Sequence, residues 1–162
     1  MGMILEKAKT CFDDKGLSYE MVGENRMAIR CPGSGNVDHV NLSASFRIEN
    51  GISIRYRFPM AVSSEQEGQV YELCSSLNCD YRWVKFFVGF GNHIYVATDG
   101  LFAADIAGEG AYRLVSVAAS VVDEAYPKVR SVLEGTDPPV SGAPCQEDEQ
   151  NPQDGGKKGV MS

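Results

Sequence analysis

The chain has 162 residues, of which 15 are Lys or Arg and 22 are Asp or Glu, so its formal net charge is −7. A chain of this length defaults to one domain and can bury roughly two thirds of its unfolded surface, enough for a hydrophobic core. The acidic balance argues against a nonspecific nucleic-acid binder, because such proteins use surplus Lys and Arg to displace phosphate counterions. No apolar run approaches the roughly 18–20 residues of a membrane span, so no membrane contact is expected.

The start of the chain and the cysteines bear on the cellular compartment. The first residues lack the basic start, apolar middle and small-residue cleavage site of an export signal. The five cysteines have no paired spacing, which is typical of reduced thiols rather than of a disulfide framework. Both features predict a cytoplasmic protein.

The first part of the chain predicts a helix followed by a short hairpin. Apolar residues recur at helical spacing over 3–15 and end at a cation and a glycine, which favours a helix there. Alternating apolar residues then predict two short strands, around 19–21 and 27–31. The Gly-rich residues 33–36 are interpreted as a flexible connector.

A stronger hairpin signal follows. Apolar residues alternate with polar ones over 40–48 and again over 52–58. Opposed residues must share a face, so the pattern selects the three-residue loop 49–51 with Ile48 opposite Ile52. On the polar face, this register pairs Arg47 with Ser53, Ser45 with Arg55 and Ser43 with Arg57.

The second half predicts a helix and another hairpin. A capping box from Ser64 to Glu67 begins a helix expected over 64–78. Aromatic and β-branched residues predict strands over 83–90 and 94–98, and a three-residue loop between them would place Lys85 opposite Asp99.

The composition changes near Gly135. Before it, apolar residues at helical spacing predict a long helix over 109–134, in which Pro127 should cause a kink or an interruption. Residues 135–162 contain five Gly, four Pro and no aromatic residue. Such a segment cannot bury enough apolar surface to offset its ordering entropy, so we expect a disordered tail.

These elements predict an α+β domain over residues 1–134, built as an antiparallel β-sheet with helices packed on one face. The expected order of elements is α-β-β-β-β-α-β-β-α. Hairpins separated by single helices make this layered arrangement the natural one.

No catalytic, metal or cofactor site is predicted. His39 and His93 stand in or beside loops, with no nucleophile or carboxylate as an obvious partner. Cys74 and Cys79 are spaced outside the usual zinc knuckle, and no second pair follows. The Gly-rich fragments do not lead from a strand into a helix, as phosphate-binding loops do. We therefore expect a protein that is not an enzyme.

The candidate binding residues are Arg47, Arg55 and Arg57 on the polar face of the central hairpin, with Trp83 and Phe87. One interpretation is a solvated sheet face whose long side chains deter aggregation. The sharper one is a docking surface for an acidic peptide or protein, since Arg is enriched at binding anchors.

Strict alternation in the last hairpin turns Trp83 and Phe87 away from the core and directs three apolar residues toward it, namely Phe86, Val88 and Phe90. An exposed apolar face usually marks a contact, and the second helix, including Tyr71, could also pack on another copy of the chain. A homodimer is therefore expected.

The order of elements and several local motifs resemble the YbjN-like family of small bacterial proteins, described as sensory transduction regulators. The resemblance covers roughly residues 3–134 and depends on four segments: Gly16-Leu17-Ser18-Tyr19-Glu20, Leu77-Asn78, the hairpin from Lys85-Phe86-Phe87-Val88 to Ile94-Tyr95-Val96, and Val122-Asp123-Glu124-Ala125-Tyr126-Pro127-Lys128-Val129. It implies a fold similar to that of type III secretion chaperones. It also implies a bacterial, cytosolic, non-enzymatic role in binding other proteins, often as a dimer, and it brings no site residues.

The sequence thus predicts a chaperone-like or regulatory protein that docks a partner on its open sheet face or edge. The alternative is a small-molecule or nucleotide sensor that uses a cleft between the sheet and the helices. A third interpretation, single-stranded RNA bound on the aromatic and arginine side chains, would need both kinds on one exposed face.

Overall fold

The computed structural model describes residues 3–47 and 51–135. The expected disorder of the C-terminal tail concerns residues beyond Gly135 and lies outside the described residues, as does Ile48.

The elements follow the expected order, which confirms the α+β prediction, and two short 3₁₀ turns are added. They are α1 (Met3–Asp14), β1 (Ser18–Gly23), β2 (Arg26–Pro32), β3 (His39–Phe46), β4 (Gly51–Ala61), η1 (Ser64–Gln66), α2 (Glu67–Asp80), β5 (Lys85–Gly89), η2 (Phe90–Asn92), β6 (His93–Leu101) and α3 (Ala107–Glu134).

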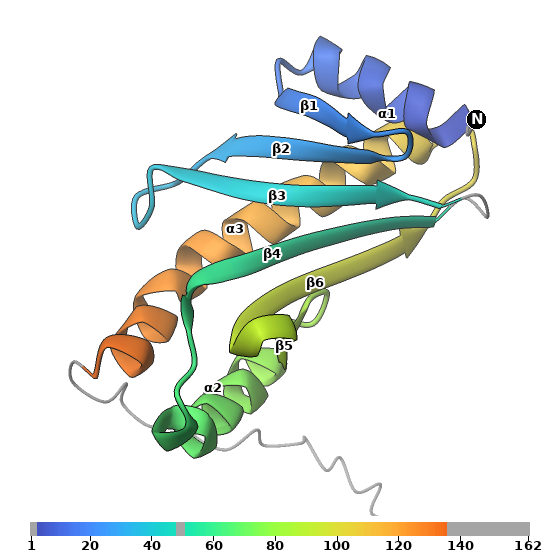
Figure 1. Ribbon diagram of the computed structural model, residues 1–162. Helices are drawn as coiled ribbons and strands as arrows, with labels where there is room; N and C mark the ends of the chain where they lie inside the picture. The colour runs from blue at the N-terminus through green and yellow to red at the C-terminus, as the bar shows by residue number, and fades with distance from the viewer. Residues whose placement is uncertain (1–2, 48–50, 136–162) are drawn as a thin grey trace, which may run out of the picture.

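The six strands form one antiparallel sheet in the order β1-β2-β3-β4-β6-β5. The helices lie on one face: α3 crosses behind the central strands, α1 packs on α3, and α2 packs beneath β5 (Figure 1). The opposite face carries no helix within the described residues, and we call it the open face. Among the described residues, no helix has the length and apolar content to cross a membrane.

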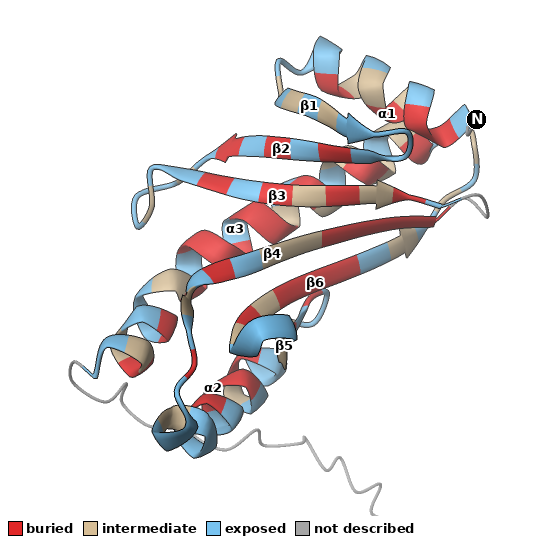
Figure 2. Ribbon diagram, viewed as in Figure 1, coloured by how far each residue is buried: buried red, intermediate tan, exposed pale blue. Residues whose placement is uncertain are grey.

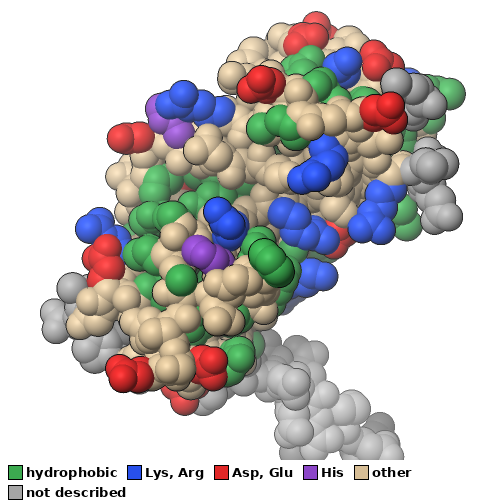
Figure 3. Space-filling model, viewed as in Figure 1, with side chains coloured by type: hydrophobic (Ala, Val, Ile, Leu, Met, Phe, Trp, Pro, Cys, Tyr) green, Lys and Arg blue, Asp and Glu red, His purple; other side chains and the backbone are tan. Residues whose placement is uncertain are grey.

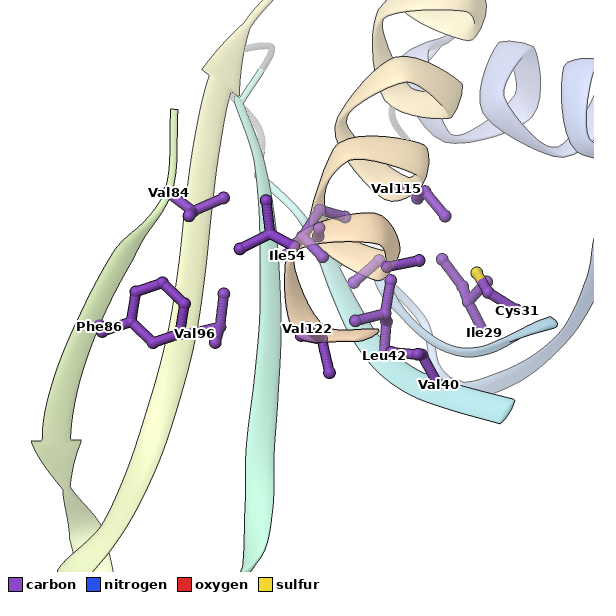
Figure 4. Close-up of a cluster of buried hydrophobic side chains, with 14 of the residues drawn as sticks. Ile29, Cys31, Val40, Leu42, Ile54, Val84, Phe86, Val96, Val115 and Val122 are labelled. Carbon is purple, nitrogen blue, oxygen red and sulfur yellow. The ribbon is translucent and has the colours of Figure 1, made fainter. Parts of the chain in front are cut away.

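Alternation along the strands explains the two-layer packing. In β2, buried and exposed residues alternate strictly, and the inward side chains meet α3 (Figure 2). Figure 4 shows this core between the strands and α3, with Ile54, Val96 and Val122 near its centre. Burial of each such aliphatic side chain contributes about 1.5–3 kcal/mol, which makes this contact the main support of the open sheet.

The β3–β4 register differs from the prediction by two residues. Phe46 lies opposite Ile52 and Ser43 opposite Arg55, and the backbone N–H of Arg47 donates to the Gly51 carbonyl at 2.8 Å. Gly51 is therefore a strand residue that also pairs with β6, rather than the last loop residue. Because the shift is even, every side chain keeps its predicted face.

The β5–β6 hairpin corrects two more expectations. Lys85 lies opposite Ala97, not Asp99. Phe90 is 91% exposed rather than in the core, because the chain leaves β5 there and turns through Gly91 at a φ of 71°. Phe86 is buried as expected.

The start of α2 and the end of α3 are joined by Gln66. The capping interaction forms one residue earlier than predicted: the backbone N–H of Ser63 donates to Gln66 Oε1 at 3.2 Å, and α2 itself begins at Glu67. Gln66 Nε2 donates to the carbonyl of Leu133 at 2.8 Å. A kink or an interruption was expected at Pro127; the helix α3 continues through it, so the interruption does not occur.

Residues 33–38 are not the flexible connector that was expected. The carboxylate of Asp123, which is only 3% exposed on α3, accepts hydrogen bonds from the backbone N–H groups of Ser34, Asn36 and Val37 at 3.0–3.2 Å. The side chains of Ser34 and Asn36 also donate to it, at 3.0 and 3.4 Å. The loop is therefore fixed to the middle of α3.

Candidate partner-binding surface

The open face concentrates positive charge in a protein that is acidic overall. Its side chains come from alternate strand positions and from Arg47, the residue after β3, and among those described are six cations and two acids. The cations are Arg26, Arg30, Arg47, Arg55, Arg57 and Lys85, and the acids are Glu20 and Asp99. Figure 3 shows Lys and Arg side chains spread across this face, with most Asp and Glu side chains toward its margins.

Arg55 is held by an acid of the neighbouring strand. Its Nη1 atom lies 3.1 Å from Asp99 Oδ1, which also accepts a hydrogen bond from Ser53 Oγ at 2.5 Å. Lys85 Nζ is 3.9 Å from the other carboxylate oxygen. Partial burial alone would raise the pKa of Asp99, but the hydrogen bonds from Ser53 and Arg55 and the nearby cations outweigh it and lower that pKa. Arg55 is thus largely neutralised within the sheet.

Three other arginines of this face have no acid partner among the described residues. Arg26, Arg47 and Arg57 are exposed, and within residues 3–47 and 51–135 none of them has a carboxylate within ion-pair distance. Arg30 instead contacts His39 Nδ1 at 3.2 Å. A guanidinium group without an internal acid retains its donors for an incoming carboxylate.

The predicted arginine trio is brought onto one face but not into one cluster. Arg47 stands beside Gly51, at one end of β4, whereas Arg57 is opposite Tyr95. Arg57 is six positions after Gly51 on β4, which is about 20 Å of extended chain. The shifted register therefore spreads the three arginines along the sheet. We call the line of side chains from Arg47 to Arg57 on the open face the arginine strip.

Aromatic side chains continue this strip at the Arg57 end. Phe87 stacks on Tyr95, with 5.6 Å between the ring centroids and 14° between the planes. Arg57, Tyr95 and Phe87 occupy one row across β4, β6 and β5. Trp83 precedes β5 in a turn and is 78% exposed, and its carbonyl accepts a hydrogen bond from Thr98.

The outer edge of β5 is partly occupied by the chain itself. Asn78, at the end of α2, donates through Nδ2 to the Phe86 carbonyl at 3.0 Å and accepts the Phe86 N–H at 2.6 Å. These bonds satisfy backbone groups that an added strand would use. An added strand would therefore have to displace Asn78 from this edge.

Two hollows bear on the alternative of a small-molecule sensor. A recess of about 220 Å³ lies between the sheet and α3, bordered by Cys31, Pro32 and Val115. That is below the roughly 300–1,000 Å³ of usual ligand sites. A larger hollow of about 620 Å³ lies between α1 and the start of α3, where Cys11 and Glu109 line it, and no strand residue contributes to it.

The free cysteines in the described part of the chain show no activated thiol. Burial raises the pKa of Cys31 and of Cys74 to about 11, which keeps both protonated at neutral pH. Cys11 is also a free thiol, whereas Cys79 is disulfide-bonded, so the expectation of reduced thiols is wrong for Cys79. In the described part of the chain, no three His, Cys, Asp or Glu side chains gather as metal ligands would.

Sequence reasoning missed the roles of Asp99 and Asp123. Asp99 decides which arginine is neutralised, and only the register of three strands reveals that. Asp123 follows Val122 on the core side of α3. A carboxylate on the core side of a helix needs hydrogen-bond donors, and the Ser- and Asn-containing residues 33–38 could have been recognised as their source.

Comparison of the sequence with known protein families identifies the family of this chain. A family model described as "YbjN: Putative bacterial sensory transduction regulator" matches residues 9–131, most of the described chain. The chain belongs to the YbjN family. No curated protein matches the sequence.

Two solved structures are similar in shape. The crystal structure of YbjN from E. coli, called a putative transcription regulator, matches with a TM-score of 0.52 and 17% identity, over 76% of this chain and 91% of that one. This likeness concerns the fold. The ExoU–SpcU heterodimer of the type III secretion system of Pseudomonas aeruginosa matches with a TM-score of 0.47 and 16% identity, over 78% of this chain and 98% of that one. That similarity is too distant to carry an argument.

Proposed function

We propose that this protein is a non-enzymatic bacterial regulator that binds another protein, and that an acidic segment of the partner docks on the open face. The observation that carries the proposal is the reversal of charge. The chain has a net charge of −7, yet the sheet face that no described helix covers holds six cations and two acids among the described residues. The family description, a sensory transduction regulator, agrees with a regulatory role.

The chemistry of recognition follows from the arginines without acids. Arg26, Arg47 and Arg57 can each offer a two-pronged set of donors to a carboxylate. The stacked Phe87 and Tyr95 lie beside Arg57 and offer apolar area to a neighbouring side chain. Such a surface attracts an acidic segment at long range and holds it by several weak contacts, so binding should be fast and sensitive to salt.

The test uses a fluorescein-labelled peptide, (Glu-Asp-Glu)₄, and the full chain. Glu147, Asp148 and Glu149 are replaced by Gln, Asn and Gln, so that the protein's own contiguous acids do not compete with the probe. In this background, Arg47→Ser with Arg57→Ser should weaken binding about tenfold in fluorescence anisotropy.

The matched control removes two cations from the helical side of the molecule, by Arg113→Ser with Arg130→Ser on α3. It changes the net charge equally and should leave the affinity within about twofold, because the strip on the sheet is intact. Equal losses in both double variants would show that only net charge matters, and the docking proposal would then be wrong.

The hollow between α1 and α3 makes a small-molecule sensor the second candidate, since its volume of about 620 Å³ is within the usual range for ligand sites. A ligand that binds only the folded state raises its melting temperature. A metabolite panel that raises the Tm of the wild type, but not of Cys11→Trp, would favour this function over peptide docking.

The proposal includes a cytoplasmic location and a homodimer. Tyr71 on α2, Trp83 and Phe90 are large apolar side chains that remain exposed, and a second copy could cover them. Sedimentation at micromolar concentration should give twice the chain mass of 17.6 kDa. A monomer mass would exclude this part of the proposal.

A further inference from the structure

The charges of this chain are divided among three places. Residues 1–134 contain 17 acidic and 13 basic residues. Of the 16 acids and 13 bases among the described residues, the open face accounts for two acids and six bases, so the rest of the described domain has 14 acids against seven bases. An acidic segment is therefore repelled by most of the domain and attracted by the open face.

The chain carries such a segment itself. Residues 136–162 contain five acids and two bases, and three of the acids are contiguous at Glu147, Asp148 and Glu149. We propose that this acidic run occupies the open face of its own chain and competes there with the partner. The inference rests on the proposed function, because it uses the same arginines.

The described residues place the start of this segment within reach of the strip. Gln66, which follows β4 by five residues, bonds to the Leu133 carbonyl, so the last turn of α3 lies at the Ala61 end of β4 (Figure 1). Arg57 is four residues before Ala61. From Arg57 to Gln66 the chain covers nine residues, at most about 30 Å.

The acidic run begins twelve residues after Gly135. Twelve extended residues span at most about 40 Å, which exceeds the path to Arg57. The Arg57 end of the strip is thus the natural site for Glu147 to Glu149.

A tethered acidic run acts at an effective concentration in the millimolar range, without any new contact being added. If the run binds the strip with a dissociation constant of about 0.1 mM, it reduces the apparent affinity for an external acidic peptide about tenfold. A partner would then need further contacts, in addition to ionic ones, to displace the acidic run. The acidic run would thereby reduce the binding of other acidic proteins that make only ionic contacts.

The experiment is run with a reductant that opens the disulfide of Cys79, and it compares the full wild-type chain with the full chain carrying Glu147→Gln, Asp148→Asn and Glu149→Gln. The (Glu-Asp-Glu)₄ peptide should bind the tail variant about tenfold more tightly. Asp137→Asn, only two residues beyond Gly135, is the control and should change little. Equal affinities for wild type and tail variant, with Arg47→Ser and Arg57→Ser still harmful in the tail variant, would overturn the inference and leave the proposed function intact.

A double-mutant cycle separates docking from general repulsion. When Arg47→Ser and Arg57→Ser are already present, neutralising the tail should no longer improve peptide binding, because the tail has lost its site. The same gain in both backgrounds would mean simple repulsion and would overturn the inference. A gain that depends on protein concentration would assign the tail to a second copy, which also contradicts docking on the same chain.

Discussion

The carboxylate of Asp123, in the middle of α3, accepts a hydrogen bond from the backbone N–H of Val37 at 3.0 Å. This bond and those from Ser34 and Asn36 join the β2–β3 connection to the helix that covers the sheet. The loop therefore belongs to the rigid support behind the open face, and the position of the arginine strip depends on it.

Gly33→Ala should destabilise the fold by about 1–3 kcal/mol. A Cβ at residue 33 would lie 1.7 Å from the Val37 carbonyl oxygen, so the loop would have to move away from Asp123. The free energy of unfolding from urea titration measures this. The control is Gly68→Ala near the start of α2, where a Cβ meets nothing within 4 Å and helix propensity favours Ala. Equal stabilities for both variants would contradict the tight loop.

Acid should destabilise the protein through Asp123. Burial by itself would raise the pKa of Asp123, but the hydrogen bonds from Val37, Ser34 and Asn36 outweigh it and place that pKa below its ordinary value. Above the ordinary value of about 3.9 the full contribution is present. As the pH falls through that value, the unfolded chain takes up the proton first, and the contribution is lost when the pH reaches the folded pKa.

Asp123→Asn should therefore lower the Tm at pH 7 and flatten the dependence of Tm on pH between about 3 and 5. Calorimetry over this range, with the exposed Asp105→Asn as the control, gives the comparison. A wild-type slope in the Asp123→Asn variant would show that the carboxylate does not contribute in this way.

Alkali should destabilise the protein through the buried thiols. The pKa of Cys31 and of Cys74 is raised by burial to about 11, so their contribution is complete below the ordinary thiol pKa of about 8.5. As the pH rises above that value, the unfolded chain loses protons first, at about 1.4 kcal/mol per pH unit for each thiol, until the pH reaches about 11. Urea unfolding at pH 8 and pH 10 should show a smaller loss in Cys31→Ala with Cys74→Ala than in the wild type. An unchanged loss would place its origin elsewhere.

Asp99→Asn should strengthen the binding of the acidic peptide about two- to fivefold in the tail-neutralised chain. The substitution removes an acid from the strip and releases Arg55, which Asp99 holds at 3.1 Å. Asp105→Asn again changes the net charge equally, away from the sheet, and should have little effect. Weaker binding by Asp99→Asn would mean that Arg55 must be positioned by Asp99 in order to act.

The sequence allowed the order of the elements and the faces of the strands to be predicted, because alternation and helical spacing are local properties. Phe46, Ile52 and Ile54 are buried as the pattern indicated. The exact pairing could not be predicted, since the hairpin 40–58 was considered alone. The structure adds β6 as a third strand, and Gly51 pairs with Leu101 on it.

The face that the candidate arginines share was predicted correctly, but their spacing was not. Arg47, Arg55 and Arg57 do share the open face, yet Arg55 is bound by Asp99, which lies 44 residues further along the chain. Whether these arginines, Trp83 and Phe87 bind a partner stays a prediction. The contact of Asp123 with residues 33–38 also joins distant segments, and no local pattern reveals such a contact.

The most direct test of the account is to map where an acidic peptide binds. In a titration of the ¹⁵N-labelled, tail-neutralised full chain with (Glu-Asp-Glu)₄, amide signals of open-face residues such as Ser45, Ser53 and Tyr95 should shift. Those of α1 should stay in place, and the shifts should disappear at about 0.5 M salt, where exposed charges are screened within a few ångströms. Shifts confined to the hollow between α1 and α3, or no shifts at low salt, would contradict docking on the open face.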